Sequence, residues 1–256
     1  MSKYLISAII ITKNEEKMIE DSLKSLDWVD EILVVDTGNT DKTNEIAKRN
    51  GAKVVKYIGN GSFADWRNEG LKYAKGDWIF YIDADERVSK FLQEEILLKT
   101  KDKTENINAY AIPRRNFIFH KEFKHSGQYP DYQKRLFKKS ELVKWTGEVH
   151  EEPEFKGKLG HIKNPMIHEK HDTLTQMVNK TNSWSEIEAK LMFDAGHPPM
   201  NLIRFATAMG REFWLRMIRQ MAFLDGPEGI IYAIYQVFSK FTSYAKLYEM
   251  QIKKRI

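Results

Sequence analysis

The sequence has no cysteine among its 256 residues. A disulfide framework and a thiolate zinc site are therefore excluded, and a reducing compartment fits the composition. No stretch reaches the roughly 18 uninterrupted apolar residues that a membrane-spanning helix needs. The first apolar run, YLISAIII, has no small-residue cleavage site after it, so we expect a strand there rather than a signal peptide.

The sequence also lacks two signatures of nucleotide binding, the GxGxxG fingerprint and the P-loop, so neither a dinucleotide cradle nor an ATP cradle is indicated. No internal repeat or low-complexity segment interrupts the chain. Hydrophobic residues make up 42% and charged residues 30% of the composition, which is typical of a folded protein with a sizeable core.

The basic excess is confined to the carboxyl-terminal part. Residues 200–256 hold nine Lys and Arg against four Asp and Glu, whereas residues 1–199 hold 32 of each sign. The net charge of +5 therefore belongs to the tail.

The first 83 residues alternate between apolar runs and helical patterns. Strands are predicted at residues 5–11, 31–36, 53–58 and 78–83, with helices between them, one of which begins after Ser62. Such alternation predicts a parallel, doubly wound sheet, in which ligands bind beyond the carboxyl ends of the strands. Later, residues 109–119 and 132–139 are predicted to form shorter strands with mixed charge. A helix is predicted at residues 173–195, and Pro198 and Pro199 prevent it from continuing. Further helices are predicted within residues 200–256, on either side of a turn at LDGPEG.

The stretch WIFYIDADERVS, residues 78–89, joins a buried strand to a group of carboxylates. Asp83 and Asp85 are two apart, so in an extended backbone they point the same way. Two carboxylates facing one ligand suit Mg²⁺ or Mn²⁺, with further positions left for water and substrate phosphates. The alternative is a polar turn that caps the next helix. Glu86 alternates away, and we expect it to cap or brace that helix.

Several motifs in order along nearly the whole chain resemble those of family 2 glycosyltransferases with the GT-A fold, and especially bacterial lipopolysaccharide core glucosyltransferases. The motifs are ISAIIITKNEE, ILVVDTGNTDKT, FADWRNEGLKYAKGDWIFYIDADE, YPDYQKRLFKK with WTGEVHE, and the tail FLDGPEGIIYAIYQVFSKFTSYAKLYE. The resemblance implies an α/β, Rossmann-like fold with a mostly parallel central sheet, helices on both faces and a carboxyl-terminal helical appendage. It also implies a nucleotide-sugar-binding half at 1–107, an acceptor-binding half at 108–199 and an amphipathic tail at 200–256.

The resemblance further implies how the donor is held. Thr12, Glu15 and Asp36 match positions that hold the base and ribose, and Arg67 matches an arginine near the base and diphosphate. Asp83 would contact the ribose. The structural alternatives are a helix-capping turn for Asp36 and a surface salt bridge for Arg67.

The implied metal is Mg²⁺ or Mn²⁺, with Asp85 as a ligand. His168 matches a histidine that approaches the metal or diphosphate, although His171 is an alternative and a purely structural role is also open. The acceptor hydroxyl needs a base within about 3 Å. Glu151 is the favoured base, with Glu148 and Asp131 as alternatives. Glu151 could instead be a surface glutamate without a catalytic role.

These roles predict a metal-dependent transfer of a sugar, with a hexose favoured. The transfer would invert the anomeric centre, so that an α-linked donor gives a β-linked product. The donor would be a nucleotide-diphosphate sugar, with UDP favoured by the resemblance. The acceptor would be a glycolipid or oligosaccharide of cell-envelope polysaccharide synthesis. A sugar nucleotidyltransferase is an alternative, but that class carries a glycine-rich loop after its first strand and TKNEEKM has no glycine. A non-catalytic membrane- or RNA-binding protein is another, although it would be expected to lose the acidic motif.

The tail combines apolar residues at helical spacing, such as Leu202, Phe205 and Met209, with interleaved arginines. A basic amphipathic helix of this kind is typical of an anionic membrane surface. We therefore expect peripheral contact with the inner, cytoplasmic face of the plasma membrane. Packing on the core, or homo-oligomer formation through these helices, is the alternative. The basic and aromatic stretch RRNFIFHKEFKHSGQYP is expected to meet an anionic glycolipid, and no nucleic acid is expected.

Overall fold

The computed structural model describes residues 5–102, 106–147, 151–171 and 173–253. The chain divides into two compact units. The first comprises residues 1–114 and 131–168, and the second comprises residues 115–130 and 169–256.

The amino-terminal part of the first unit has the predicted alternation. Its strands are β1 (Ile6–Thr12), β2 (Glu31–Asp36), β3 (Lys53–Lys56) and β4 (Trp78–Asp83), and its helices are α1 (Ile19–Lys24), α2 (Thr43–Arg49) and α3 (Phe63–Tyr73). The four strands pair in parallel in the order β3-β2-β1-β4. Helix α1 begins only at Ile19, because the chain first turns through Asn14, whose φ is +60°.

Beyond β4 the sheet becomes mixed. The further elements are β5 (Glu86–Arg87), α4 (Lys90–Lys101), β6 (Ile107–Ile118), β8 (Asp131–Lys138), β9 (Leu142–Thr146), β10 (Glu152–Phe155), β11 (Lys158–His161) and β12 (Met166–His171). Strand β8 lies antiparallel to both β4 and β6, and the order continues β4-β8-β6-β12-β5. Strand β6 runs for 12 residues and contains all but the last residue of the strand predicted at 109–119.

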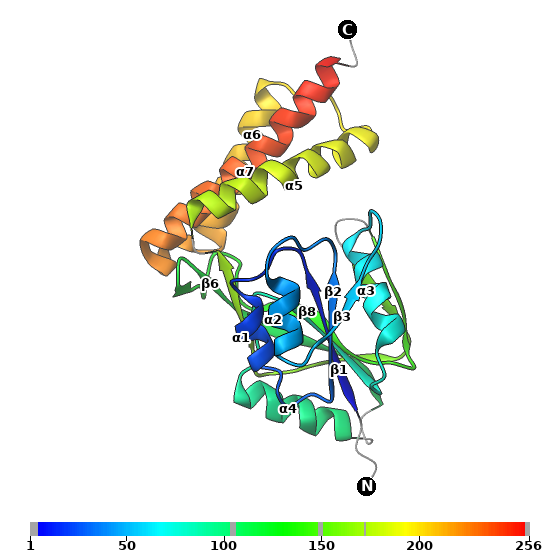
Figure 1. The fold of residues 1–256 in the computed structure, drawn as a ribbon. Helices are drawn as coiled ribbons and strands as arrows, with labels where there is room; N and C mark the ends of the chain where they lie inside the picture. Colours follow the sequence, from blue (N-terminus) through cyan, green and yellow to red (C-terminus); the bar gives the residue numbers. More distant parts are fainter. Residues whose placement is uncertain (1–4, 103–105, 148–150, 172, 254–256) are drawn as a thin grey trace. The chain divides into compact units, whose positions relative to one another are not determined.

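Helices cover both faces of this sheet, with α1 and α2 on one side and α3 on the other (Figure 1). The alternation of side chains along β1 explains the two layers. Ile10 packs in a buried cluster with residues of α1, α2 and α4, whereas Ile9 packs with residues of α3, β9 and β10. Helix α3 lies close to the sheet at Gly70, where a Cβ atom would come 2.6 Å from a methyl carbon of Ile9.

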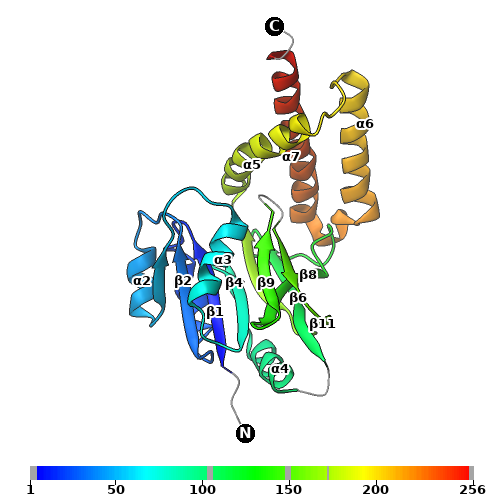
Figure 2. The same cartoon turned by 90° about the vertical axis from the view of Figure 1, so that its right-hand side faces the viewer.

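The second unit is mainly helical (Figure 2). It contains β7 (Lys121–Glu122), α5 (Leu174–Asp194), α6 (Leu202–Phe213), the π-helical turn η1 (Trp214–Arg219), the 3₁₀ turn η2 (Ala222–Asp225) and α7 (Gly226–Lys253). Helix α7 packs against both α5 and α6, and Ala189 of α5 is buried with Leu247 of α7. Among the described residues, no helix is long and apolar enough to cross a membrane.

Candidate active site

The carboxyl ends of β1, β2 and β4 lie together at one edge of the sheet, as the sequence predicts. In the strand register Thr12 lies opposite Asp36, and the neighbouring Ile11 lies opposite Asp83. The alternating fold therefore brings polar residues from three separate segments to one edge, where ligands of such sheets bind.

Asp83 lies between two buried arginines. The Nη2 atom of Arg67 is 3.4 Å from Oδ1 of Asp83, and Arg135 donates from both terminal nitrogens to the two carboxylate oxygens. Burial of the Asp83 carboxyl opposes ionisation, but the charges of Arg135 and Arg67 outweigh it and hold the pKa of Asp83 well below its usual range. Asp83 is therefore a carboxylate at any physiological pH.

Glu86 does not cap the following helix, so that expectation was wrong. Its side chain is fully buried, and Oε2 accepts a hydrogen bond of 2.8 Å from the backbone N–H of Asp83. Its Oε1 accepts from Nη2 of Arg135 at 3.0 Å. The cap of α4 is Ser89, whose hydroxyl accepts from the backbone N–H of Leu92. Glu86 instead braces the strand end and the arginine that holds Asp83.

Asp85 differs from Asp83 in its surroundings. Strand β4 ends at Asp83 and Asp85 lies in the turn that follows, so the two carboxylates have different partners and the extended-backbone argument for a shared direction was wrong. Oδ2 of Asp85 lies 3.4 Å from Nε2 of His168. His168 is buried on β12, where it pairs in register with Glu86 of β5.

The pair formed by Asp85 and His168 fits a divalent cation that keeps other positions for phosphate and water. The side chain of Asp85 is 32% exposed, and a carboxylate with an imidazole is a donor set that Mn²⁺ accepts. Within the described ranges no group of three or more His, Cys, Asp or Glu side chains could hold a metal. Such an ion would therefore take most of its ligands from a substrate, which is usual for Mg²⁺ at phosphate sites.

Arg67 lies on the inward face of α3, because it is spaced three residues from both buried Ala64 and Gly70. Its guanidinium donates to Oε1 of Glu151 from Nε at 3.2 Å and from Nη2 at 3.1 Å. It also lies 4.8 Å from the ring centre of Trp145, which is cation–π distance. Arg67 is 4% exposed, so its pair with Glu151 is not the surface salt bridge considered as an alternative.

A cavity of about 210 Å³ is lined by Arg67, Asp83, Arg135 and Glu151, among others. The alternative base Asp131 is not among the lining residues and is held by Arg114, whose Nη2 lies 2.6 Å from its Oδ2. Glu148 lies outside the described residues, and the side chain of His171 is not described.

Thr12, Asp36 and Glu15 take part in the loops beyond β1 and β2. Oδ1 of Asp36 accepts from the backbone N–H groups of Gly38 and Asn39, at 2.8 and 2.7 Å. Burial raises the pKa of Asp36, but these bonds outweigh it and lower the pKa overall. The Thr12 hydroxyl accepts from Asn39 Nδ2, and the backbone N–H of Glu15 donates to the Thr43 hydroxyl. Asp36 thus stabilises a turn at residues 36–39 but does not cap α2, whose N-cap is Lys42. The binding roles of Thr12, Glu15 and Asp36 stay predictions.

Sequence reasoning assigned no role to Arg135, and it placed Arg114 only in the basic stretch expected to meet an anionic glycolipid. In the structure both arginines pair with carboxylates, namely those of Glu86, Asp83 and Asp131. Arg135 is 4% exposed although it carries a permanent charge. The sequence feature that indicates its burial is the position of Arg135 in QKRLF, immediately before two fully buried residues of a central strand.

The fold and this edge of the sheet define a GT-A-like α/β protein with an acidic site braced by arginines. The family described as Glycosyl transferase family 2 matches residues 7–155. The chain belongs to this family, and it is a glycosyltransferase. The predicted fold class is confirmed.

Similar proteins cover almost the whole chain. An uncharacterized glycosyltransferase of Rickettsia bellii is 32% identical over 97% of this chain and 87% of its own length. The lipopolysaccharide core biosynthesis glycosyltransferase LpsC of Rhizobium meliloti is 26% identical over 98% of this chain and 95% of its own length.

A solved structure of glucosyl-3-phosphoglycerate synthase from Mycobacterium tuberculosis, in complex with Mn²⁺, UDP and phosphoglyceric acid, is 26% identical to this chain. The likeness covers 45% of this chain and 43% of that one, with a TM-score of 0.37. The likeness thus covers less than half of either chain, and a TM-score so low supports no inference.

Proposed function

We propose that this glycosyltransferase is inverting and metal-dependent, and that it moves a hexose from a nucleotide-diphosphate sugar to a glycolipid or oligosaccharide of the cell envelope. The observation that carries the proposal is the arrangement at the end of β4. There Asp85 with His168 supplies a cation site, while Asp83, Arg67 and Glu151 line the cavity of the same unit. The similarity to LpsC supports a lipopolysaccharide-type acceptor.

The donor is held at the carboxyl edge of the sheet. Thr12, Glu15 and Asp36 shape the site for base and ribose, for which uracil is favoured. Asp83, which its arginines keep ionised, accepts hydrogen bonds from ribose hydroxyls.

Asp85 and His168 would hold the Mg²⁺ or Mn²⁺ ion, which would supply positive charge to stabilise the leaving diphosphate. The protein holds these two side chains in place, because Asp85 follows a buried strand and His168 is fixed by β12.

Glu151 is the general base. Arg67 binds one of its oxygens, Oε1, and so orients the carboxylate with Oε2 as the second oxygen to receive a proton. The acceptor hydroxyl loses its proton to Glu151 as its oxygen bonds to the anomeric carbon. The bond from that carbon to the phosphate oxygen breaks, and the nucleoside diphosphate departs. One in-line displacement inverts the anomeric centre, so an α-linked donor gives a β-linked product.

The three segments divide this work. Residues 1–107 hold the donor, residues 108–199 supply the base and meet the acceptor, and the helical tail of residues 200–256 attaches the enzyme peripherally to the cytoplasmic face of the membrane. Many large apolar side chains of the tail are exposed, which supports such attachment or a homo-oligomer.

The test is release of nucleoside diphosphate from a panel of sugar donors, with and without Mn²⁺, for the wild type and Asp85→Ala. We expect metal-dependent release by the wild type alone. Absence of release from every donor would favour the non-catalytic alternative, and release of pyrophosphate from a sugar phosphate with a nucleoside triphosphate would favour the nucleotidyltransferase.

A further inference from the structure

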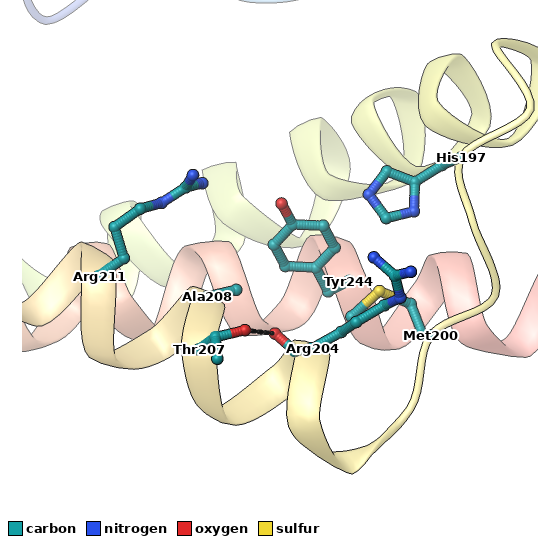
Figure 3. A pocket seen from close by; sticks show the side chains of 7 residues that line it. All are labelled: His197, Met200, Arg204, Thr207, Ala208, Arg211 and Tyr244. Atoms are coloured by element: carbon teal, nitrogen blue, oxygen red, sulfur yellow. Dashed lines mark hydrogen bonds between the residues drawn. The ribbon is translucent and has the colours of Figure 1, made fainter.

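Helices α6 and α7 and the segment before α6 border an open cavity of about 230 Å³ within the second unit (Figure 3). Its polar lining consists of His197, Arg204, Thr207, Arg211 and Tyr244. Arg204 and Arg211 are seven residues apart on α6, so they lie on one face of the helix, two turns from each other. In Figure 3 the ring of Tyr244 lies between the two arginines, and the imidazole of His197 lies above the guanidinium of Arg204.

The cavity is cationic. Its lining contains no carboxylate. Within the part of the chain that the structure describes, neither Arg204 nor Arg211 forms a salt bridge, whereas Arg216 on the next turns is held by Glu212 at 2.7 Å. Two guanidinium groups on one cavity without a protein carboxylate form a site that is complementary to an anion.

The neighbouring groups add donors and positive charge. The Nδ1 atom of His197 lies 2.8 Å from the carbonyl oxygen of Pro198, to which it donates, and this contact fixes the ring. The imidazole packs beside the Tyr244 ring at 5.7 Å between centres. Nζ of Lys240 lies 5.2 Å from the same ring, so a further cation approaches the Tyr244 side of the cavity.

We propose that this cavity binds the phosphate group of an anionic membrane phospholipid. The planar guanidinium fork matches two phosphate oxygens, and Tyr244 offers a hydroxyl donor. The Thr207 hydroxyl donates to the carbonyl oxygen of Ile203 at 2.8 Å, so it can only accept from a ligand. The lipid origin follows from the residues that precede Arg204. Leu202 is 84% exposed and Ile203 is 73% exposed, and no residue of α6 is buried. Apolar side chains can thus enter the acyl boundary while the arginines hold the headgroup. The inference rests on the proposed membrane attachment of the tail and is independent of the sugar transfer.

Sedimentation with vesicles tests this assignment. The full chain is mixed with vesicles of phosphatidylcholine, or of phosphatidylcholine with phosphatidylglycerol, and the bound fraction is measured. We expect binding to the second type only. Arg204→Lys and Arg211→Lys keep the positive charge but remove the planar pair of donors that a guanidinium offers to two phosphate oxygens. Each substitution is therefore expected to weaken binding at least about fivefold. Tyr244→Phe, which changes no charge, is expected to weaken it about twofold to fivefold, the value of one hydrogen bond.

Arg219→Lys is the matched control, because Arg219 is exposed on the same basic stretch and does not line the cavity. We expect it to bind as the wild type does. If all the lysine variants bind as the wild type does, charge alone suffices and the cavity is not the site. If inorganic phosphate raises the thermal stability of the wild type but not of Arg204→Lys, while vesicle binding is unaffected by the substitution, the ligand is free phosphate and the lipid assignment is overturned. If the wild type binds neither vesicle, the membrane attachment fails and this inference fails with it, whereas donor cleavage would still report on the catalytic proposal.

Discussion

Arginines serve opposite purposes in the two units of this protein. In the first unit Arg67 and Arg135 are buried, and each contacts two carboxylates. In the second unit Arg204 and Arg211 are exposed and line a cavity without a carboxylate. A buried charge must be paired to be tolerated, whereas an exposed one keeps its hydration until a ligand arrives. The first arrangement fixes the geometry of the proposed catalytic site, and the second leaves charge available for the proposed anion.

The strongest test of this contrast is removal of Arg135. Arg135→Ala leaves Glu86 fully buried without its closest cation, so we expect the free energy of unfolding to fall by about 3–5 kcal/mol. Urea unfolding followed by circular dichroism measures the change. Arg115→Ala is the control, because that arginine is half-exposed in its pair with Glu122, and the loss there should stay below about 1 kcal/mol. Equal losses in the two variants would contradict the role given to burial.

The second prediction concerns Oε2 of Glu151, the carboxylate oxygen that Arg67 does not contact. Glu151→Gln cannot accept a proton, so kcat should fall by about 100-fold or more, while affinity for the donor is kept. Steady-state transfer assays and donor titrations separate these effects. The control is Glu154→Gln on the same hairpin, where the side chain is 50% exposed and transfer should be unchanged. An unaltered kcat in Glu151→Gln would contradict its role as the general base and would favour Asp131 or Glu148 in that role.

The third prediction is a pH dependence of stability that belongs to the first unit. The pKa of Asp83 is depressed in the folded state, and the carboxyl of an unfolded aspartate titrates near about 3.9. The stabilisation is therefore present above about pH 4 to 5 and is lost as the pH falls toward the folded-state pKa. We expect the free energy of unfolding to decline from about pH 5 to pH 2, and Asp83→Asn to flatten this decline. A decline of equal slope in the variant would assign the effect to other carboxyls.

The smallest effect is expected in the second unit. Arg204→Gln removes an exposed side chain without a salt-bridge partner in the described residues, so the free energy of unfolding should change by less than about 0.5 kcal/mol. The same urea experiment measures it. A loss comparable to that of Arg135→Ala would mean that Arg204 is a structural residue and not a reserved ligand group.

Much of the fold could be predicted from the sequence, because each of the first four strands is a separate apolar run with a polar boundary. Strand β6 was also predicted closely, because apolar residues flank Arg114 and Arg115 on both sides and continue to Ile118. The periodicity of the tail predicted helices correctly, but it did not indicate which faces of α6 would border a cavity.

The site was predictable only in part. Asp83 could be recognised at a strand end, but its partner Arg135 is 52 residues away in sequence, and Glu86 is 49 residues from the same arginine. No local pattern indicates which charges meet over such separations. The direction of Asp85 also failed to follow from spacing, because the strand ends before it.

The central claim is that Asp85 with His168 holds the cation on which donor binding depends. It is tested most directly by calorimetric titration of UDP into the wild type and Asp85→Asn, each with and without Mn²⁺. We expect Mn²⁺ to tighten UDP binding at least about tenfold in the wild type, which corresponds to about 1.4 kcal/mol, and to leave the variant unchanged. Equal tightening in both proteins would contradict the assignment of the metal to Asp85.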